Sequence, residues 1–202
     1  MLWMITDFSK TSGLEKSIGH ISGCLENGAG AVTLRNNGAV SDISVRRIKD
    51  VLDSTFPDKL IFIHDPQEQD ICKYRHFHFP SGRINEACEL KKRNPSLIVA
   101  VSTHSKAEYE KAFSNGIDMA VLSPLFKPFS KPGDTRATVA PVKLKNLYLL
   151  GGIDRMKALG LVERGFTDIA GISLFYDEYT ATVIKELSTL IMEKEYGIAY
   201  SN

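Results

Sequence analysis

The sequence has few cysteines, no long apolar run and no excess of charge of one sign. Its three cysteines, Cys24, Cys72 and Cys88, show no CxxC spacing, which argues against a disulfide framework or zinc site and predicts a reducing cytoplasm. No apolar run approaches the roughly 20 residues of a membrane span, and the opening MLWMITD lacks the basic segment of a signal peptide. With 25 basic and 24 acidic residues, neither nucleic acid nor a membrane is an expected partner.

What the sequence does have is an alternation of apolar runs and helical patterns. The strand-length runs are LWMIT, AVTLR, LIFIH, FHF, LIVAVS, MAVLS, LYLLG and DIAGIS. Most are continuously apolar, which is typical of parallel strands covered on both faces. Eight strand–helix alternations predict an α/β fold, a single (β/α)₈ TIM barrel domain over residues 1–202. A doubly wound open sheet is the alternative, because periodicity cannot show closure.

Helix starts are predicted from capping patterns. Ser12 with Glu15 and Ser105 with Glu108 have the spacing of capping boxes, and Asp154 is a third N-cap. The helices after the third and sixth runs are expected to be short or interrupted by proline.

Two glycines follow the seventh run, in LYLLGGID. Between a strand and a helix N-terminus, Gly151 and Gly152 let backbone N–H groups approach a phosphate without a Cβ in the way. A plain tight turn is the alternative interpretation. Ser173 ends the eighth run and would lie beside the glycines in a barrel, which favours phosphate. Gly152→Val is therefore expected to weaken phosphate binding and to leave the fold intact.

Residues at other strand ends have two possible roles each. Arg35 is an anion clamp or a partner of Asp7 or Asp65, and Asp65 is a ligand for a hard cation or a helix cap. His76 and His78 share one face of a strand at a metal-binding spacing, but we favour interior, hydrogen-bonded histidines because no third ligand is evident.

The sixth run leads into the loop PLFKPFSKPGD. Its three prolines, at positions 124, 128 and 132, stiffen the chain around Ser130 and Lys131. A hydroxyl and a cation on a rigid loop suit an anionic ligand, although surface turns also collect these residue types.

Several segments, in order from about Leu2 to Phe175, resemble the thiamine phosphate synthase family, which includes the thiazole tautomerases. They are LWMITD, GAGAVTLR, LIFIHD, FHFPSG, VSTHSKAEYEKAFSNGIDMAVLSPLF, the following SK, LLGGI and GISLF. The resemblance implies a (β/α)₈ barrel that joins a phosphorylated pyrimidine, hydroxymethylpyrimidine diphosphate, to a thiazole phosphate. Diphosphate would be released with the help of Mg²⁺.

The resemblance also implies roles for particular residues. Catalytic roles fall on Lys131 and Arg35, which face the diphosphate, and the Mg²⁺ ligand is Asp65. The implied substrate-binding residues are Ser102 near the pyrimidine, Ser130, Gly151, Gly152, Ile172, Ser173 and His64. The thiazole phosphate would lie with Gly152 and Ser173. The oligomeric state is open, a homo-oligomer included.

This sequence also departs from the family pattern. Thr33 replaces a pyrimidine-contacting glutamine, Asn37 a diphosphate lysine, and His64 an asparagine. Arg83 stands where the second Mg²⁺ aspartate is expected, and Pro124 where the tautomerases have a histidine. The thiazole phosphate half is kept, whereas the diphosphate and metal half is partly rebuilt.

Three functions are therefore weighed in this order. The first is a transferase that makes thiamine phosphate, with Lys131, Arg35 and an Asp65-bound Mg²⁺ stabilising the leaving diphosphate and Arg83 replacing lost positive charge. The second is an isomerase of the thiazole phosphate, for which His64, His78 and His104 are the candidate acid–base groups. The third is a non-catalytic binder of a phosphorylated heterocycle.

Overall fold

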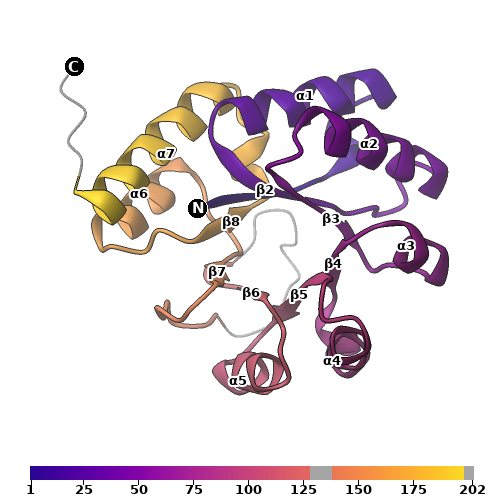
Figure 1. Ribbon diagram of the computed structural model, residues 1–202. Coiled ribbons are helices and arrows are strands. Elements are labelled where there is room, and N and C mark those ends of the chain that lie inside the picture. Colours follow the sequence, from indigo (N-terminus) through magenta and orange to yellow (C-terminus); the bar gives the residue numbers. More distant parts are fainter. Residues whose placement is uncertain (128–137, 198–202) are drawn as a thin grey trace.

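The apolar runs form the parallel strands of a closed barrel in the computed structural model, which describes residues 1–127 and 138–197 (Figure 1). Each strand pairs with the next, and β1 closes the ring by pairing with β8, Leu2 opposite Ile169. The predicted (β/α)₈ barrel is thus confirmed, and the open-sheet alternative is wrong. The strands are β1 Leu2–Ile5, β2 Ala29–Leu34, β3 Leu60–His64, β4 His76–Phe79, β5 Ile98–Thr103, β6 Met119–Leu122, β7 Leu147–Leu149 and β8 Ile169–Gly171.

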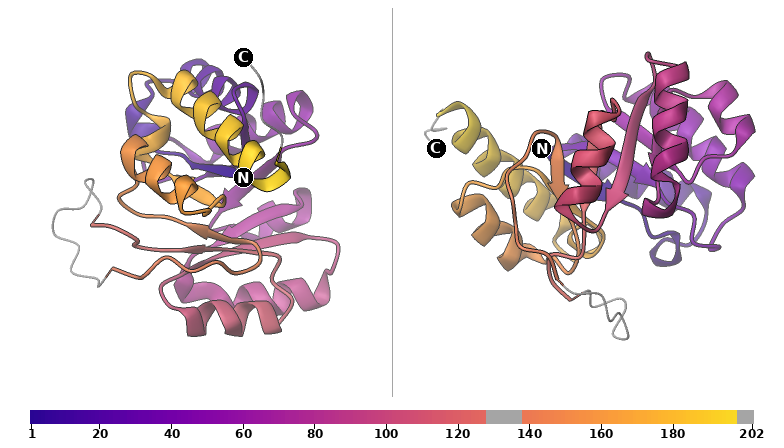
Figure 2. Two further views of the ribbon diagram at one scale, coloured as in Figure 1. Left: turned by 90° about the vertical axis from the view of Figure 1, so that its left-hand side faces the viewer. Right: turned by 90° about the horizontal axis from the view of Figure 1, so that it is seen from below.

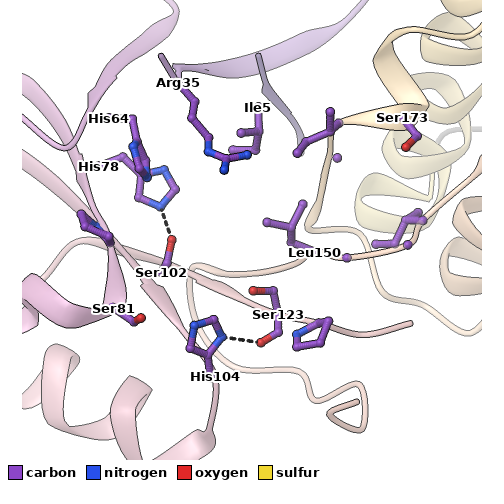
Figure 3. A pocket seen from close by; sticks show the side chains of 17 residues that line it. Ile5, Arg35, His64, His78, Ser81, Ser102, His104, Ser123, Leu150 and Ser173 are labelled. Atoms are coloured by element: carbon purple, nitrogen blue, oxygen red, sulfur yellow. Dashed lines mark hydrogen bonds between the residues drawn. The ribbon is translucent and has the colours of Figure 1, made fainter. Parts of the chain in front are cut away.

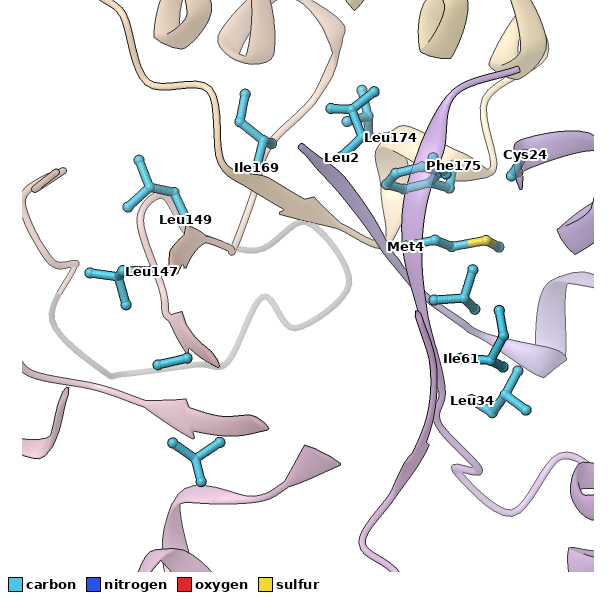
Figure 4. Packing of buried hydrophobic residues seen from close by; sticks show 14 of the residues in the cluster. Leu2, Met4, Cys24, Leu34, Ile61, Leu147, Leu149, Ile169, Leu174 and Phe175 are labelled. Atoms are coloured by element: carbon cyan, nitrogen blue, oxygen red, sulfur yellow. The ribbon is translucent and has the colours of Figure 1, made fainter. Parts of the chain in front are cut away.

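Within each strand, alternate side chains pack on opposite sides of the barrel wall. Trp3 belongs to a cluster inside the barrel with Phe62 and Tyr148, whereas its neighbours Leu2 and Met4 pack outside among helix residues such as Cys24 (Figure 4). Both sides of the wall are therefore apolar, which explains why the runs show no alternation in the sequence. Polar side chains within these runs are exceptions inside an apolar interior.

Helices surround the strands on the outside of the barrel (Figure 1). In the part of the chain that is described they are α1 Leu14–Glu26, α2 Asp42–Thr55, α3 Glu68–Lys73, α4 Ile84–Arg93, α5 Lys106–Ser114, α6 Arg155–Glu163 and α7 Thr180–Tyr196. None of them is both long enough and apolar enough to cross a membrane.

Two of the three predicted N-caps are confirmed. The side chain of Ser105 accepts a hydrogen bond from the Glu108 amide, and that of Asp154 accepts one from the Lys157 amide. The Ser12 cap is wrong: α1 begins after Gly13, which has φ +92 and serves as N-cap without a side-chain bond. The positive φ of this glycine brings the chain into the helix one residue later than the sequence pattern indicates.

Between β6 and β7, the described residues 123–127 and 138–146 contain no helix (Figure 2). Val139, Val142 and Leu144 of this irregular chain pack against the outer core in place of a helix face. The sixth strand–helix alternation thus has no helix in the described residues, as the proline-rich sequence predicted. The short helix α3 after β3 agrees with the same expectation.

Candidate active site

The carboxyl ends of the strands enclose a cavity of about 280 Å³ (Figure 3). Because this end of a barrel carries the loops that vary between proteins, it is where a binding site is expected. The predicted site residues that line it are Arg35, His64, Ser102, Gly151, Gly152, Ile172 and Ser173. Ser130 and Lys131 lie outside the described residues.

Arg35 supplies positive charge to the cavity. It follows β2, and its side chain points toward the middle of the cavity in Figure 3. Among the described residues no carboxylate pairs with its guanidinium, because Asp65 pairs with Arg83 and Asp7 accepts from Ser9 and Asn37. Of the two readings, the ion-paired Arg35 is therefore wrong for the described residues. An unpaired cation on a cavity wall is suited to an anionic ligand.

Gly151 and Gly152 also line the cavity, between β7 and α6. Both have positive φ, +108 and +62, and they touch the chain that follows β6. A Cβ on Gly152 would lie 2.5 Å from the Lys127 carbonyl oxygen, and one on Gly151 would lie 2.7 Å from the Cα of Pro124. These glycines are thus required by close packing of two loops. Their N–H groups have no protein acceptor within the described residues, so they remain available to a ligand.

Ser173 begins the short 3₁₀ helix Ser173–Phe175 directly after β8. Its hydroxyl makes no hydrogen bond to another described residue, and its side chain is exposed at the edge of the cavity (Figure 3). Since β7 and β8 are paired neighbours, the backbone amides of the two glycines and this hydroxyl come from adjacent strand ends. The predicted juxtaposition of Gly152 and Ser173 is consistent with this arrangement, which suits a phosphate.

Two neutral histidines form a further wall. The rings of His64 and His78 pack edge to face with centroids 5.4 Å apart. Burial, together with the charge of Arg35, lowers the pKa of His64 to about 4. Burial also lowers the pKa of His78, with a smaller contribution from His64 and Arg35. Both side chains are therefore uncharged at pH 7.

The interior, hydrogen-bonded interpretation is confirmed for His78, whereas His76 is half-buried and its Nδ1 has no hydrogen-bond partner among the described residues. His78 is 2% exposed and hydrogen-bonded at both ring nitrogens, and His76 packs against Phe62 deeper in the barrel. In the described ranges, no three or more His, Cys, Asp or Glu residues are grouped to hold a metal ion.

Asp65 does not line the cavity. It follows β3 with φ +54, and its carboxylate binds Nη1 of Arg83. The remaining nitrogens of Arg83 donate to Glu86, and the hydrogen bonds that Arg83 donates to Glu86 and, to a smaller extent, to Asp65 raise its pKa. The helix-cap role of Asp65 is wrong, because α3 is capped by Gln67.

Comparison with known proteins identifies the family. A family model described as thiamine monophosphate synthase matches residues 2–175. The chain belongs to the thiamine monophosphate synthase family. The resemblance found from the motifs is thereby confirmed over the same part of the chain.

One curated relative in this family is a putative thiamine-phosphate synthase 2 from Aquifex aeolicus (strain VF5). It is 35% identical over 99 residues, which cover 44% of this chain and 50% of that protein. The match to this curated relative thus extends over about half of its length.

Solved structures agree on the fold. A thiamine phosphate pyrophosphorylase from Pyrococcus furiosus superposes with a TM-score of 0.70 at 20% identity, covering 96% of each chain. A 3-hexulose-6-phosphate synthase from Salmonella typhimurium superposes with a TM-score of 0.65 at 10% identity, and the match covers 96% of this chain and 100% of that one. At these identities the likeness supports the barrel and carries no argument on chemistry.

Membership of the thiamine monophosphate synthase family raises the question of Mg²⁺, which the resemblance places at Asp65. The residues present do not fit such a site. A magnesium ion prefers several oxygen ligands, but the one predicted carboxylate is paired with a guanidinium. Position 83, where a second aspartate is expected, carries that guanidinium itself. Mg²⁺ binding stays a prediction, and we assign no chemical step to a metal.

Arg83→Asp should create a Mg²⁺ site. The change removes the guanidinium from Asp65 and Glu86 and adds a third carboxylate beside them. At a Mg²⁺ concentration about ten times Kd, binding would stabilise the variant by about 1.4 kcal/mol, which raises the melting temperature by roughly 3–6 °C for a chain of this size. Differential scanning fluorimetry with NaCl at matched ionic strength measures this shift. Arg83→Gln is the control, since it frees the same two carboxylates without adding one. An equal Mg²⁺ shift in the wild-type protein would contradict this description of the Asp65 site.

The place of Thr33 inside the barrel was not predicted from the sequence. Thr33 was noted only as a departure from the family, yet it is fully buried and hydrogen-bonded to both Trp3 and His78. A signal was present, because Thr33 and His78 interrupt otherwise apolar runs. In a wall that is apolar on both sides, such interruptions mark positions where polar groups must be paired.

Proposed function

We propose that the protein is a transferase of thiamine biosynthesis, which joins hydroxymethylpyrimidine diphosphate to thiazole phosphate and releases diphosphate. Family membership supports a synthase-type role with small pyrimidine and thiazole phosphate substrates. The observation that carries the proposal is the guanidinium of Arg35, which pairs with no carboxylate among the described residues. The same cavity offers the Ser173 hydroxyl and the backbone amides of Gly151 and Gly152, which have no acceptor in the described part of the chain. Such a cavity has groups for anions at two places, as two phosphorylated substrates require.

In this proposal each wall of the cavity serves one substrate. The thiazole phosphate lies with Gly151, Gly152, Ile172 and Ser173, where amide and hydroxyl donors suit phosphate oxygens. The pyrimidine ring lies against Ser102 and His64. Its diphosphate faces Arg35.

The chemical step breaks the bond between the pyrimidine methylene carbon and the diphosphate oxygen while the thiazole forms a new bond to that carbon. The diphosphate gains negative charge as its bond to carbon breaks. A fixed cation near that oxygen stabilises the transition state more than the bound substrate. We propose that Arg35 and Lys131 do this, and that Ser130 donates to the thiazole phosphate. Ser130 and Lys131 lie outside the described residues.

The other two functions are not favoured. An isomerase needs a group that exchanges protons near neutral pH, but for two of its three candidate groups, His64 and His78, the pKa is lowered, for His64 to about 4. The third candidate, His104, also lines the cavity, and its Nδ1 lies 2.7 Å from the Ser123 carbonyl oxygen. A site that holds only the thiazole phosphate beside Ser173 would also not use the positive charge of Arg35, which has no carboxylate partner among the described residues.

We further propose that the protein works in a reducing cytoplasm. Cys24, Cys72 and Cys88 are all free thiols, and two of them are buried. Free cysteines of this kind are typical of a compartment that does not form disulfides.

One assay tests the proposal. The protein is incubated with both phosphorylated substrates, with Mg²⁺ or with EDTA, and thiamine phosphate is measured by chromatography. Formation of thiamine phosphate supports the transferase. Conversion of the thiazole phosphate alone would show an isomerase instead, and thermal stabilisation by the substrates without any product would show a binder.

A further inference from the structure

A chain of hydrogen bonds crosses the barrel interior and ends at the cavity. Trp3 Nε1 donates to Thr33 Oγ1 over 3.0 Å, and Thr33 Oγ1 lies 3.0 Å from His78 Nδ1. The other ring nitrogen, His78 Nε2, lies 3.0 Å from Ser102 Oγ (Figure 3). Trp3, Thr33 and His78 are at most 2% exposed, whereas Ser102 lines the cavity.

The direction of this chain follows from the number of protons available. The indole of Trp3 can only donate, so it cannot accept the hydroxyl proton of Thr33. Among the described residues, Nδ1 of His78 is the remaining partner of that hydroxyl. If His78 donated instead, a buried hydroxyl proton would have no acceptor, which is costly. Thr33 therefore donates to His78 Nδ1.

The direction then fixes the tautomer of His78 and the role of Ser102. With Nδ1 accepting, the proton of the neutral ring is on Nε2, and Nε2–H donates to Ser102 Oγ. The neutral state agrees with the burial of the ring, which lowers its pKa. The hydroxyl proton of Ser102 makes no hydrogen bond to another described residue, so it can be donated into the cavity.

We infer that Trp3, Thr33 and His78 are positioning residues that make Ser102 a hydrogen-bond donor, so that the ligand atom at Ser102 is an acceptor, such as an unprotonated ring nitrogen of an aromatic heterocycle. This inference rests on the proposed function for the identity of the ligand and deepens it, because it states which kind of atom the pyrimidine presents to Ser102. A ligand that offers only an N–H group there leaves the Ser102 proton without an acceptor.

Reversing the direction of these hydrogen bonds shows why Trp3 and Thr33 determine what Ser102 offers to a ligand. If Thr33 had another acceptor for its proton, His78 could carry its proton on Nδ1. Ser102 would then donate to Nε2, and its oxygen could only accept from a ligand. The polarity that the cavity presents to a ligand is thus decided by buried residues that do not line it, Trp3 and Thr33.

The tautomer of His78 tests the chain directly. Nitrogen-15 NMR of histidine-labelled protein distinguishes Nε2–H from Nδ1–H in a neutral ring, and no ligand is needed. We expect Nε2–H in the wild-type protein and in Thr33→Ser, which keeps the hydroxyl. We expect a mixture of tautomers in Thr33→Val, which has the same shape without a proton to donate. Nδ1–H in the wild-type protein would overturn the inference, as would an unchanged tautomer in a folded Thr33→Val variant. The wild-type spectrum decides even if Thr33→Val does not fold.

Ligand binding provides the second readout, with hydroxymethylpyrimidine as the probe. Its Kd, measured by NMR titration, should change less than about threefold in Thr33→Ser and rise about tenfold in Thr33→Val, the scale of one hydrogen bond. An equal loss of affinity in both variants would overturn the positioning role of the hydroxyl. If the wild-type protein does not bind hydroxymethylpyrimidine, the pyrimidine is not the ligand and the proposed function is overturned. The tautomer of His78 would still show whether the hydrogen bonds from Trp3 to Ser102 run in the inferred direction.

Discussion

Arg35→Ala should lower kcat/KM for thiamine phosphate formation by about 10²- to 10³-fold, the scale typical of losing one electrostatic stabiliser of a transition state. The guanidinium has no carboxylate partner among the described residues, so the substitution breaks no ion pair within that part of the chain. The melting temperature should therefore stay within about 1–2 °C of that of the wild-type protein. Loss of activity at unchanged stability is the result expected of a residue that serves a ligand.

Two further variants make this result specific. Arg35→Lys keeps the charge but loses the planar fork of donors, so its activity should lie between those of the wild-type protein and Arg35→Ala. Arg47→Ala removes an arginine from the exposed side of α2 and should leave kcat/KM unchanged. Titration calorimetry with inorganic diphosphate should show weaker binding only in the Arg35 variants. Full activity of Arg35→Ala would remove this residue from the site.

A neighbouring histidine reports on the same charge without any substrate. The pKa of His64 is lowered to about 4 by burial and, to a smaller extent, by Arg35. Removing the guanidinium should therefore raise the pKa of His64, which NMR titration of its ring signals measures. An unchanged pKa would mean that the guanidinium points away from the cavity in solution.

Gly152→Ala should reduce both the stability of the fold and the affinity for thiazole phosphate. A Cβ at this position would lie 2.5 Å from the Lys127 carbonyl oxygen and 2.9 Å from Phe126 Cβ, and the backbone has φ +62. A left-handed conformation alone costs an alanine about 1–2 kcal/mol, and the chain after β6 must also shift. We expect a loss of about 2–4 kcal/mol in the free energy of unfolding, as for other strained backbone positions.

The structure thus corrects the expectation that a substitution at Gly152 leaves the fold intact. The glycine is needed first for loop packing, and the phosphate depends on the geometry that this packing produces. Gly19→Ala is the matched control, because Gly19 lies exposed in α1 with no atom within 4 Å of the added Cβ. It should gain roughly 0.5–1 kcal/mol from helix propensity. Urea unfolding and calorimetry with thiazole phosphate at low temperature measure the two effects. A Gly152→Ala variant as stable as the wild-type protein would contradict the packing argument.

The sequence by itself predicted the strands, favoured a barrel over an open sheet, and supplied seven of the residues that line the cavity. Apolar runs report burial of the strand on which they lie, and the carboxyl end of each run must open at the same end of a parallel barrel. Arg35, Ser102 and Ser173 could be placed in the site for that reason alone. The motif series from Leu2 to Phe175 placed the chain in the thiamine monophosphate synthase family.

Only the tertiary structure decided which side chains meet. Asp65 was expected to hold a metal, but Arg83, eighteen positions later in the chain, reaches its carboxylate after β4 returns beside β3. Gly152 was expected to serve a ligand, but the β6 loop packs against it. Thr33 and His78 are 45 positions apart and became partners because β2 and β4 both turn a side chain into the barrel. Periodicity records whether a residue is buried, whereas hydrogen bonds and close contacts between distant residues depend on strand register and loop packing.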